Sequence, residues 1–238
     1  MFETSKTDHG TCWDCLFAAG APYRPLEAGG DLSAHRTGAG RVRAGAVIVR
    51  GGTTPGTVHV LRDGWAFRYA VLESGKRQIL NFLVPGDLFD LDSLILPSGT
   101  AIFSTQALTP LSYCRFETNA FRKLMHSSEE RARAFNDQLA AHLTCKARQL
   151  SALGQQRALA RLAMLILSLH HRLQLRQLAI NGAFDFPPRQ EHLADALGMT
   201  TEHVNRTLTT LRNDGIITQD GRTLQILDID KLRSIAAH

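Results

Sequence analysis

The apolar positions of this chain follow two different periods. Between Val42 and Phe116 they alternate with polar positions in six short runs, at 46–50, 57–61, 65–72, 78–84, 102–108 and 111–116. A period of two is typical of half-buried strands. Turn residues separate the runs, and Asp63-Gly64 predicts a two-residue hairpin because glycine tolerates the positive φ that such a turn needs. Short strands at this spacing predict an antiparallel sandwich or barrel.

From Ser127 onward the period becomes about 3.6. Ser127-x-x-Glu130 is a capping-box pattern, and a stripe follows it that ends at Gly154 and contains Phe135, Leu139, Leu143, Leu150 and Leu153. One interpretation is a helix that packs on its own sheet. We favour a dimerisation helix over 127–154, because the stripe is long and leads toward the motif described next.

Residues 188–227 carry the strongest functional pattern. A helix is expected at 155–173, followed by a polar connection over 174–188, a short helix at 190–197 and a second helix from about Thr200 to Asn213. Small or apolar residues stand where two such helices must meet, and Gly198 provides the tight turn between them. The pattern predicts a helix-turn-helix, with Thr200 or Thr201 capping the second helix.

The outward face of the second helix carries groups that recognise base edges. Thr201, Glu202, Asn205 and Arg206 lie at its N-terminal end, the part that enters a major groove. Arginine can donate two hydrogen bonds to guanine, and glutamate can accept one from cytosine. An alternative interpretation of Glu202 and Arg206, four residues apart, is a surface ion pair.

Two strands around Asp220-Gly221 predict a wing. They are expected at 216–218 and 224–227, with Arg222 near the tip as a phosphate contact. The remaining candidate DNA-contacting residues are Thr200 and Arg189, which stand at the starts of the two helices.

Charge agrees with a polyanionic partner. Residues 146–238 hold 12 Lys and Arg against 8 Asp and Glu, a net charge of +4, whereas the rest of the 238-residue chain is +1. The pattern shows neither a secretory signal nor an apolar run long enough to cross a bilayer, so we expect a cytoplasmic protein with no membrane partner. His170 and His171 are expected on a helix surface.

The chain as a whole resembles the Crp/Fnr superfamily over about Val42 to Leu232. The segments that carry the resemblance are GWAFR at 64–68, GKRQI at 75–79, PGDLF at 85–89 and EHVNR at 202–206. The resemblance implies an α+β protein with an N-terminal cyclic-nucleotide-binding-like β-barrel (jelly roll), a long dimerisation helix and a C-terminal winged helix-turn-helix. An N-terminal extension is expected at 1–41 and the barrel at 42–126. The dimerisation helix is expected at 127–154 and the winged helix-turn-helix at 155–238.

The recognition helix looks like that of the Fnr and FixK branch. That resemblance implies a homodimer on a palindromic DNA site with TTG and CAA half-site cores, and contact with RNA polymerase. Asn205 stands where the branch usually has serine, which leaves the flanking base of each half-site open.

The sensor-like domain departs from the cyclic AMP receptor. After the PGD segment, that receptor has a Gly-Glu pair for the ribose and later an Arg-Ser pair for the phosphate, where this chain has Asp90-Leu91 and Ile102-Phe103 or their neighbours. An aspartate beside a phosphate, with no arginine to neutralise it, opposes binding. We therefore expect that cyclic AMP does not bind.

An iron–sulfur cluster is the other cofactor that the resemblance implies. Cys12, Cys15 and Cys114 lie where three of the four Fnr ligands would be, and the third N-terminal cysteine is missing, so a further ligand such as Asp8, His9 or Asp14 would be needed. Alternatively, Cys12 and Cys15 form a redox pair or have no role, and Cys114 and Cys145 are buried as small apolar residues. A regulator with a cluster or a redox pair would respond to oxygen or redox state. A regulator whose cysteines have no such role would be constitutively active, with no bound effector.

Two other classes of function have less support in the sequence. It lacks a Walker loop, a Gly-x-Ser-x-Gly segment and a His-Glu-x-x-His segment, so we do not expect an enzyme. A winged helix can also bind protein instead of DNA, and a protein-interaction module is therefore the main alternative.

Overall fold

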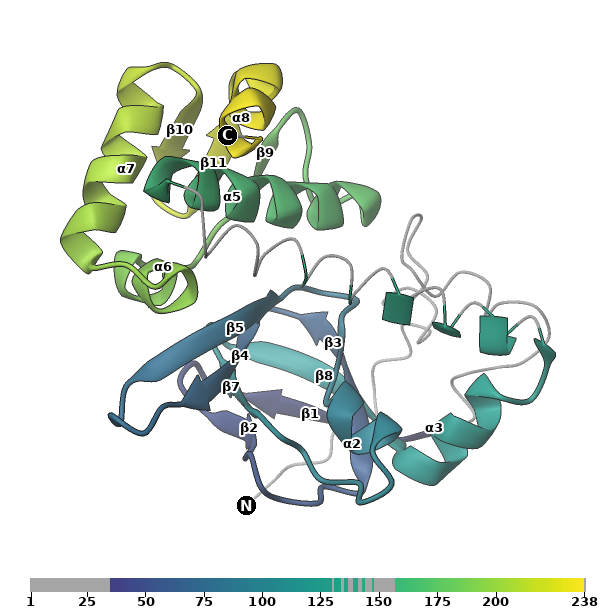
Figure 1. Cartoon of the computed structure of the whole chain (residues 1–238). Helices are drawn as coiled ribbons and strands as arrows, with labels where there is room; N and C mark the ends of the chain where they lie inside the picture. Colours follow the sequence, from purple (N-terminus) through teal and green to yellow (C-terminus); the bar gives the residue numbers. More distant parts are fainter. Residues whose placement is uncertain are drawn as a thin grey trace. The chain divides into compact units, whose positions relative to one another are not determined.

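The computed structural model describes residues 35–237 except 130, 134, 137–138, 141–142, 144–146 and 148–156. The chain divides into two compact units, one formed mainly by residues up to 140 and the other mainly by residues from 141 onward. Each unit is described by itself (Figure 1).

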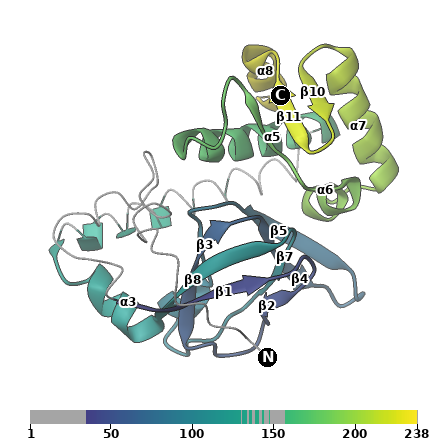
Figure 2. The ribbon, with the colours of Figure 1, turned by 180° about the vertical axis from the view of Figure 1, so that it is seen from behind.

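Two four-stranded sheets form the first unit. One has the order β1 (Arg36–Val42), β8 (Leu111–Glu117), β3 (Thr57–Asp63), β6 (Leu88–Phe89), and the other has the order β2 (Val47–Val49), β7 (Ser104–Ala107), β4 (Ala66–Val71), β5 (Arg77–Leu83). Figure 2 shows β8 between β1 and β3. The alternation of the sequence places its apolar side chains inward, among them Phe67, Phe82, Phe89 and Phe116. The predicted antiparallel β-domain is confirmed.

The turn at Asp63-Gly64 differs from the prediction of a hairpin. β3 pairs with β6 and β8, whereas β4 pairs with β7, so the turn carries the chain from one sheet to the other. Gly64 has a φ of 80°, and a Cβ at this position would overlap the carbonyl oxygen of Pro110. The glycine is needed, but for a close crossing rather than for a hairpin.

Four elements of the first unit were not expected from the pattern. β1 begins at Arg36, inside the range assigned to an N-terminal extension, and β6 and the short helix α2 (Leu91–Ile95) follow the PGD segment. Helix α3 (Thr118–Met125) comes after β8, and its N-cap residue Glu117 accepts hydrogen bonds from the backbone N–H groups of Asn119 and Ala120.

The predicted long helix is only partly within the described residues. Residues 129, 131–133, 135–136, 139–140, 143 and 147 are helical, and Ser128 Oγ, rather than that of Ser127, accepts the cap hydrogen bond from the N–H of Arg131. Phe135 is buried in a cluster with Phe116, Phe121 and Met125, and Leu139 packs against that cluster. Leu143 is 67% exposed, and Leu150 lies outside the described residues. The stripe therefore begins as a core-packing face of the first unit.

The second unit is a winged helix. Its elements are α5 (Ala158–Leu175), β9 (Ala183–Asp185), α6 (Gln190–Leu197), α7 (Thr201–Asn213), β10 (Ile217–Asp220), β11 (Thr223–Ile226) and α8 (Ile229–Ala236). The sheet order is β10-β11-β9, so the connection expected over 174–188 contains a third strand that pairs with the wing.

His170 and His171 of α5 were both expected on the helix surface, and the structure differs for one of them. His171 is exposed, but His170 is buried, and its ring centroid lies 5.7 Å from that of Phe184.

Candidate nucleic-acid interface and sensor site

Helices α6 and α7 form the predicted helix-turn-helix. Leu193, Ala194 and Leu197 of α6 are buried, as are Val204, Leu208 and Leu211 of α7. Gly198 ends α6 in the left-handed conformation, with a φ of 62°, so that the chain turns directly into α7.

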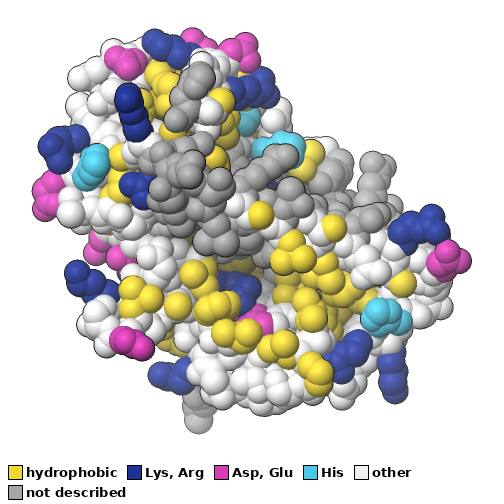
Figure 3. Space-filling model, in the orientation of Figure 1, with side chains coloured by type: hydrophobic (Ala, Val, Ile, Leu, Met, Phe, Trp, Pro, Cys, Tyr) yellow, Lys and Arg dark blue, Asp and Glu magenta, His cyan; other side chains and the backbone are white. Residues whose placement is uncertain are grey.

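One face of α7 remains in solvent. Thr201, Glu202, Asn205 and Arg206 are all exposed, because the apolar positions of the helix point to the other side. In Figure 3, basic, acidic and histidine side chains lie close together along the α7 edge of the unit. The same helix also exposes three residues that the sequence prediction did not include: His203, Thr209 and Arg212. Thr209 lies seven residues, or about two turns, after Glu202, so helical spacing could have identified it.

The N-terminus of α7 is capped by Thr200. The Thr200 hydroxyl oxygen accepts a hydrogen bond from the backbone N–H of His203 at 3.2 Å. The Glu202 carboxylate accepts hydrogen bonds from its own backbone N–H and from the Thr200 hydroxyl, and these bonds, with a smaller contribution from Arg206, lower the pKa of Glu202. Glu202 is thus ionised and held at the helix end that would enter a groove.

The wing carries an arginine at its tip, as predicted. Arg222 lies in the turn between β10 and β11, and its Nε and Nη2 donate to the two carboxylate oxygens of Asp185 at 3.1 and 2.7 Å. This forked pair is largely exposed and fixes the direction of the guanidinium. Arg189, the N-cap residue of α6, is exposed beside Glu191.

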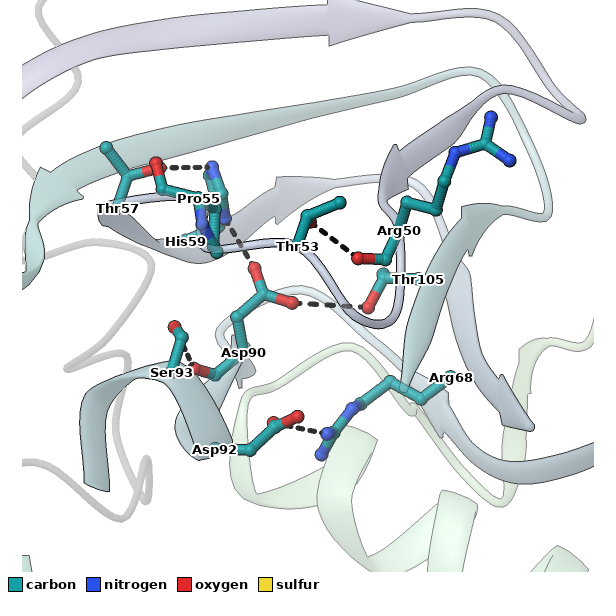
Figure 4. A network of polar contacts seen from close by, with 10 residues as sticks. All are labelled: Arg50, Thr53, Pro55, Thr57, His59, Arg68, Asp90, Asp92, Ser93 and Thr105. Carbon is teal, nitrogen blue, oxygen red and sulfur yellow. Dashed lines mark hydrogen bonds and ion pairs between the residues drawn. The ribbon is translucent and has the colours of Figure 1, made fainter. Parts of the chain in front are cut away.

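A polar network lies inside the barrel, near the start of α2 (Figure 4). Asp90 has a φ of 67° and is fully buried; its carboxylate lies 2.6 Å from His59 Nδ1 and accepts a hydrogen bond from the Thr105 hydroxyl at 3.4 Å. The other ring nitrogen of His59 lies 3.3 Å from the hydroxyl oxygen of Thr57. Asp90 is therefore satisfied inside the protein and fixes the start of α2.

The second aspartate of this segment, Asp92, is the one that meets the segment at Ile102 and Phe103. Its carboxylate accepts hydrogen bonds from Arg68 and from the backbone N–H groups of Ile102 and Phe103. The pairing of Asp92 with Arg68 was not expected from the sequence, because Arg68 lies on β4, 24 positions before Asp92.

The described residues do not assemble an iron–sulfur site. The Cys114 side chain is 3% exposed and lies in the apolar cluster with Val58, Val60 and Phe116. Cys12 and Cys15 lie outside the described residues. In the part of the chain that the structure describes, no three His, Cys, Asp or Glu side chains are grouped to hold a metal ion.

Known proteins match both units. Residues 40–128 match the cyclic nucleotide-binding domain, and residues 160–235 match the Crp-like helix-turn-helix domain. The nitrogen fixation regulation protein FixK of Bradyrhizobium diazoefficiens is 30% identical over 71% of this chain and 69% of its own length. The transcriptional activator protein FnrL of Cereibacter sphaeroides is 26% identical over 76% and 72%. The solved structure of FixK2 from Bradyrhizobium japonicum superposes with a TM-score of 0.74 at 25% identity, covering 85% of this chain and 98% of that one.

The fold and the exposed recognition helix define a transcription regulator with a cyclic-nucleotide-binding-like domain and a helix-turn-helix DNA-binding domain. More specifically, the chain belongs to the Crp/Fnr family, in its FixK-like branch. Its relatives are transcription regulators and not enzymes, as expected. Across the described residues, none of the helices has the length and apolarity needed to span a membrane.

The buried His170 predicts acid sensitivity of the second unit. Burial lowers the pKa of His170, with smaller contributions from His171 and Arg233. The unfolded chain therefore binds a proton at a higher pH than the folded chain, and the free energy of unfolding should fall as the pH drops below the ordinary histidine pKa of about 6.5. We expect a lower Tm at pH 5.5 than at pH 7.5.

The difference in Tm should shrink in His170→Gln and persist in the control His171→Gln, because His171 is exposed. His192, whose pKa burial also lowers, should account for part of the remaining slope. Equal pH profiles for the wild type and His170→Gln would contradict the prediction.

Proposed function

We propose that this regulator binds, as a homodimer, a palindromic DNA site with TTG and CAA half-site cores. The observation that carries the proposal is the exposed face of α7, on which Glu202, Asn205 and Arg206 are available while the apolar face is buried. A carboxylate and a guanidinium one turn apart match a cytosine and a guanine in neighbouring positions of the major groove. Arg189, Thr200, Thr201 and Arg222 would contact phosphates around them.

The homodimer is supported by the family and by the described residues of the apolar stripe that begins at Phe135. The helical stripe starts in the core of the first unit at Phe135 and reaches an exposed leucine at Leu143. An exposed leucine on a helix is a candidate contact for the same position of a second copy. Two copies would present two recognition helices to the two halves of a palindrome.

For the sensor, we propose a regulator that works without a bound effector. The aspartates of the α2 segment are both satisfied by protein groups, and Cys114 lies in an apolar core. We do not expect cyclic AMP to bind, because a phosphate at the N–H groups of Ile102 and Phe103 would meet the carboxylate of Asp92. We place the protein in the cytoplasm, where it would act with RNA polymerase at the promoter.

The alternative is a redox-responsive regulator. Anaerobic purification, with iron analysis and DNA binding measured before and after exposure to air, tests it: bound iron and a change in DNA binding on exposure to air would favour the redox response.

The test of DNA recognition is fluorescence anisotropy with two duplexes of equal length. One carries the TTG/CAA palindrome and the other the same bases in scrambled order. We expect much tighter binding to the palindrome. Equal affinities for both duplexes would contradict the proposed site, and failure to bind any duplex by a folded protein would favour the protein-interaction module.

Salt dependence gives a second measurement on the same complex. If the dimer neutralises about six phosphates or more, its affinity should fall by roughly 10³-fold or more between 50 and 200 mM salt. Arg222→Ala should weaken binding to both duplexes alike and make the slope of log K against log salt shallower by about one for each phosphate that is no longer neutralised. Arg233→Ala, an exposed arginine on α8, is the matched control and should leave the slope unchanged.

A further inference from the structure

Three donors from two separate parts of the barrel converge on the carboxylate of Asp92. Nη2 of Arg68, on β4, donates to Asp92 Oδ1 at 2.5 Å. The backbone N–H groups of Ile102 and Phe103, just before β7, donate to Oδ2 at 2.5 and 3.4 Å. Figure 4 shows Arg68 and Asp92 pointing toward one another from β4 and α2.

These donors form a partly enclosed anion site. The side chains of Arg68 and Asp92 are only 13% and 10% exposed. The guanidinium carbon of Arg68 lies 5.4 Å from the centre of the Phe103 ring, which holds the guanidinium from a second side. Arg68 Nε is buried without a hydrogen-bond partner among the described residues, so the site has donor capacity beyond what Asp92 uses. A guanidinium with two successive backbone N–H groups is a set of donors that binds carboxylate or phosphate.

The other aspartate of the segment does not compete for this site. Asp90 is engaged with His59 and Thr105 on its own side of the α2 start. Asp92 is therefore the carboxylate that joins α2, the segment before β7, and β4.

We propose that Asp92 is a built-in anion, which closes the α2–β7 segment onto β4 in place of an anionic effector. The sensor domain then reaches its closed arrangement without a ligand. An external phosphate or carboxylate would have to displace a carboxylate that is part of the same chain. The link from this closure to DNA binding rests on the proposed function, whereas the closure itself is a property of the barrel.

The test removes the carboxylate and supplies a small one in solution. In Asp92→Ala the amides of Ile102 and Phe103 lose a charged acceptor, and we expect the Ile102 amide to exchange its hydrogen about tenfold faster or more than in the wild type. Sodium formate should slow this exchange again and raise the Tm of Asp92→Ala in a saturable way. Sodium chloride at the same ionic strength should not.

Two controls separate site occupancy from general effects. The wild type should not respond to formate, because Asp92 already fills the site, and Asp63→Ala, which removes an exposed aspartate of the same unit, should behave like the wild type. Formate stabilisation of all three proteins alike, or unprotected Ile102 and Phe103 amides in the ligand-free wild type, would overturn the proposal.

A further variant covers the case in which Asp92→Ala does not fold. Asp92→Asn keeps the volume and loses the charge, so the Ile102 amide should exchange faster than in the wild type. Wild-type protection in this variant would overturn the proposal.

DNA binding by the same variants is measured separately. Weaker palindrome binding by Asp92→Ala that formate restores would support the link to output, whereas a wild type that binds no duplex would contradict the proposed function and leave the exchange result to decide the closure.

Discussion

Arg206→Ala is expected to lose specific DNA binding. Arg206 is exposed on the outward face of α7, one turn beyond Glu202. A bidentate arginine–guanine contact contributes about 1 to 3 kcal/mol of discrimination, and a dimer makes it twice, so the loss should be about 2 to 6 kcal/mol, or roughly 30-fold and upward in affinity. The measurement is anisotropy with the palindromic duplex.

The expected loss is specific to the sequence of the DNA. Affinity for the scrambled duplex should change little, because the contact is to a base and not to the backbone. Arg233→Ala provides the matched loss of an exposed arginine elsewhere in the second unit and should bind as the wild type does. An Arg206→Ala protein that loses affinity equally on both duplexes would assign Arg206 to a phosphate instead.

Gly64→Ala should have the largest effect on the stability of the barrel. Gly64 combines a φ of 80° with a close backbone approach that leaves no room for a Cβ beside the carbonyl oxygen of Pro110. Left-handed strain and overpacking each cost about 1 to 3 kcal/mol, so we expect a loss of about 3 kcal/mol in the free energy of unfolding. Urea denaturation measures it.

Gly75→Ala is the matched control for the backbone strain alone. Gly75 has a φ of 77°, and no heavy atom of the described residues lies within 4 Å of the position of its missing Cβ. Its loss should therefore be the smaller of the two, about 1 kcal/mol. Equal losses in the two variants would show that the crossing at Gly64 has room to move.

The strands that could be predicted are those with an apolar side. β1 could not, because it uses Gly38 and Gly40 where an inward apolar residue would normally stand. A Cβ at Gly40 would overlap the ring of Tyr113, so the glycine is what lets β1 lie against β8. β9 could not be predicted for a different reason. It has only three residues, and its partner β11 is far away along the chain, with Thr223 opposite Asp185.

The two candidate sites differ in the same way. The recognition helix could be predicted because helical spacing alone determines which of its side chains face solvent. The sensor network could not, since Asp90 meets His59 across 31 positions and Asp92 meets Arg68 across 24. The first pairing depends on β3 lying beside β6 in one sheet, and the second on α2 lying beside β4. A local pattern contains neither.

The carboxylate of Asp92 lies close along the chain to the segment that donates hydrogen bonds to it. Ten positions separate Asp92 from Ile102, so the carboxylate acts as a tethered ligand. A group on a short flexible connection competes at an effective concentration of about millimolar, so a free anion would have to exceed that concentration to displace it. With its anion supplied by its own chain, we expect the regulator to occupy its DNA sites in proportion to its abundance, which the cell sets by synthesis and degradation.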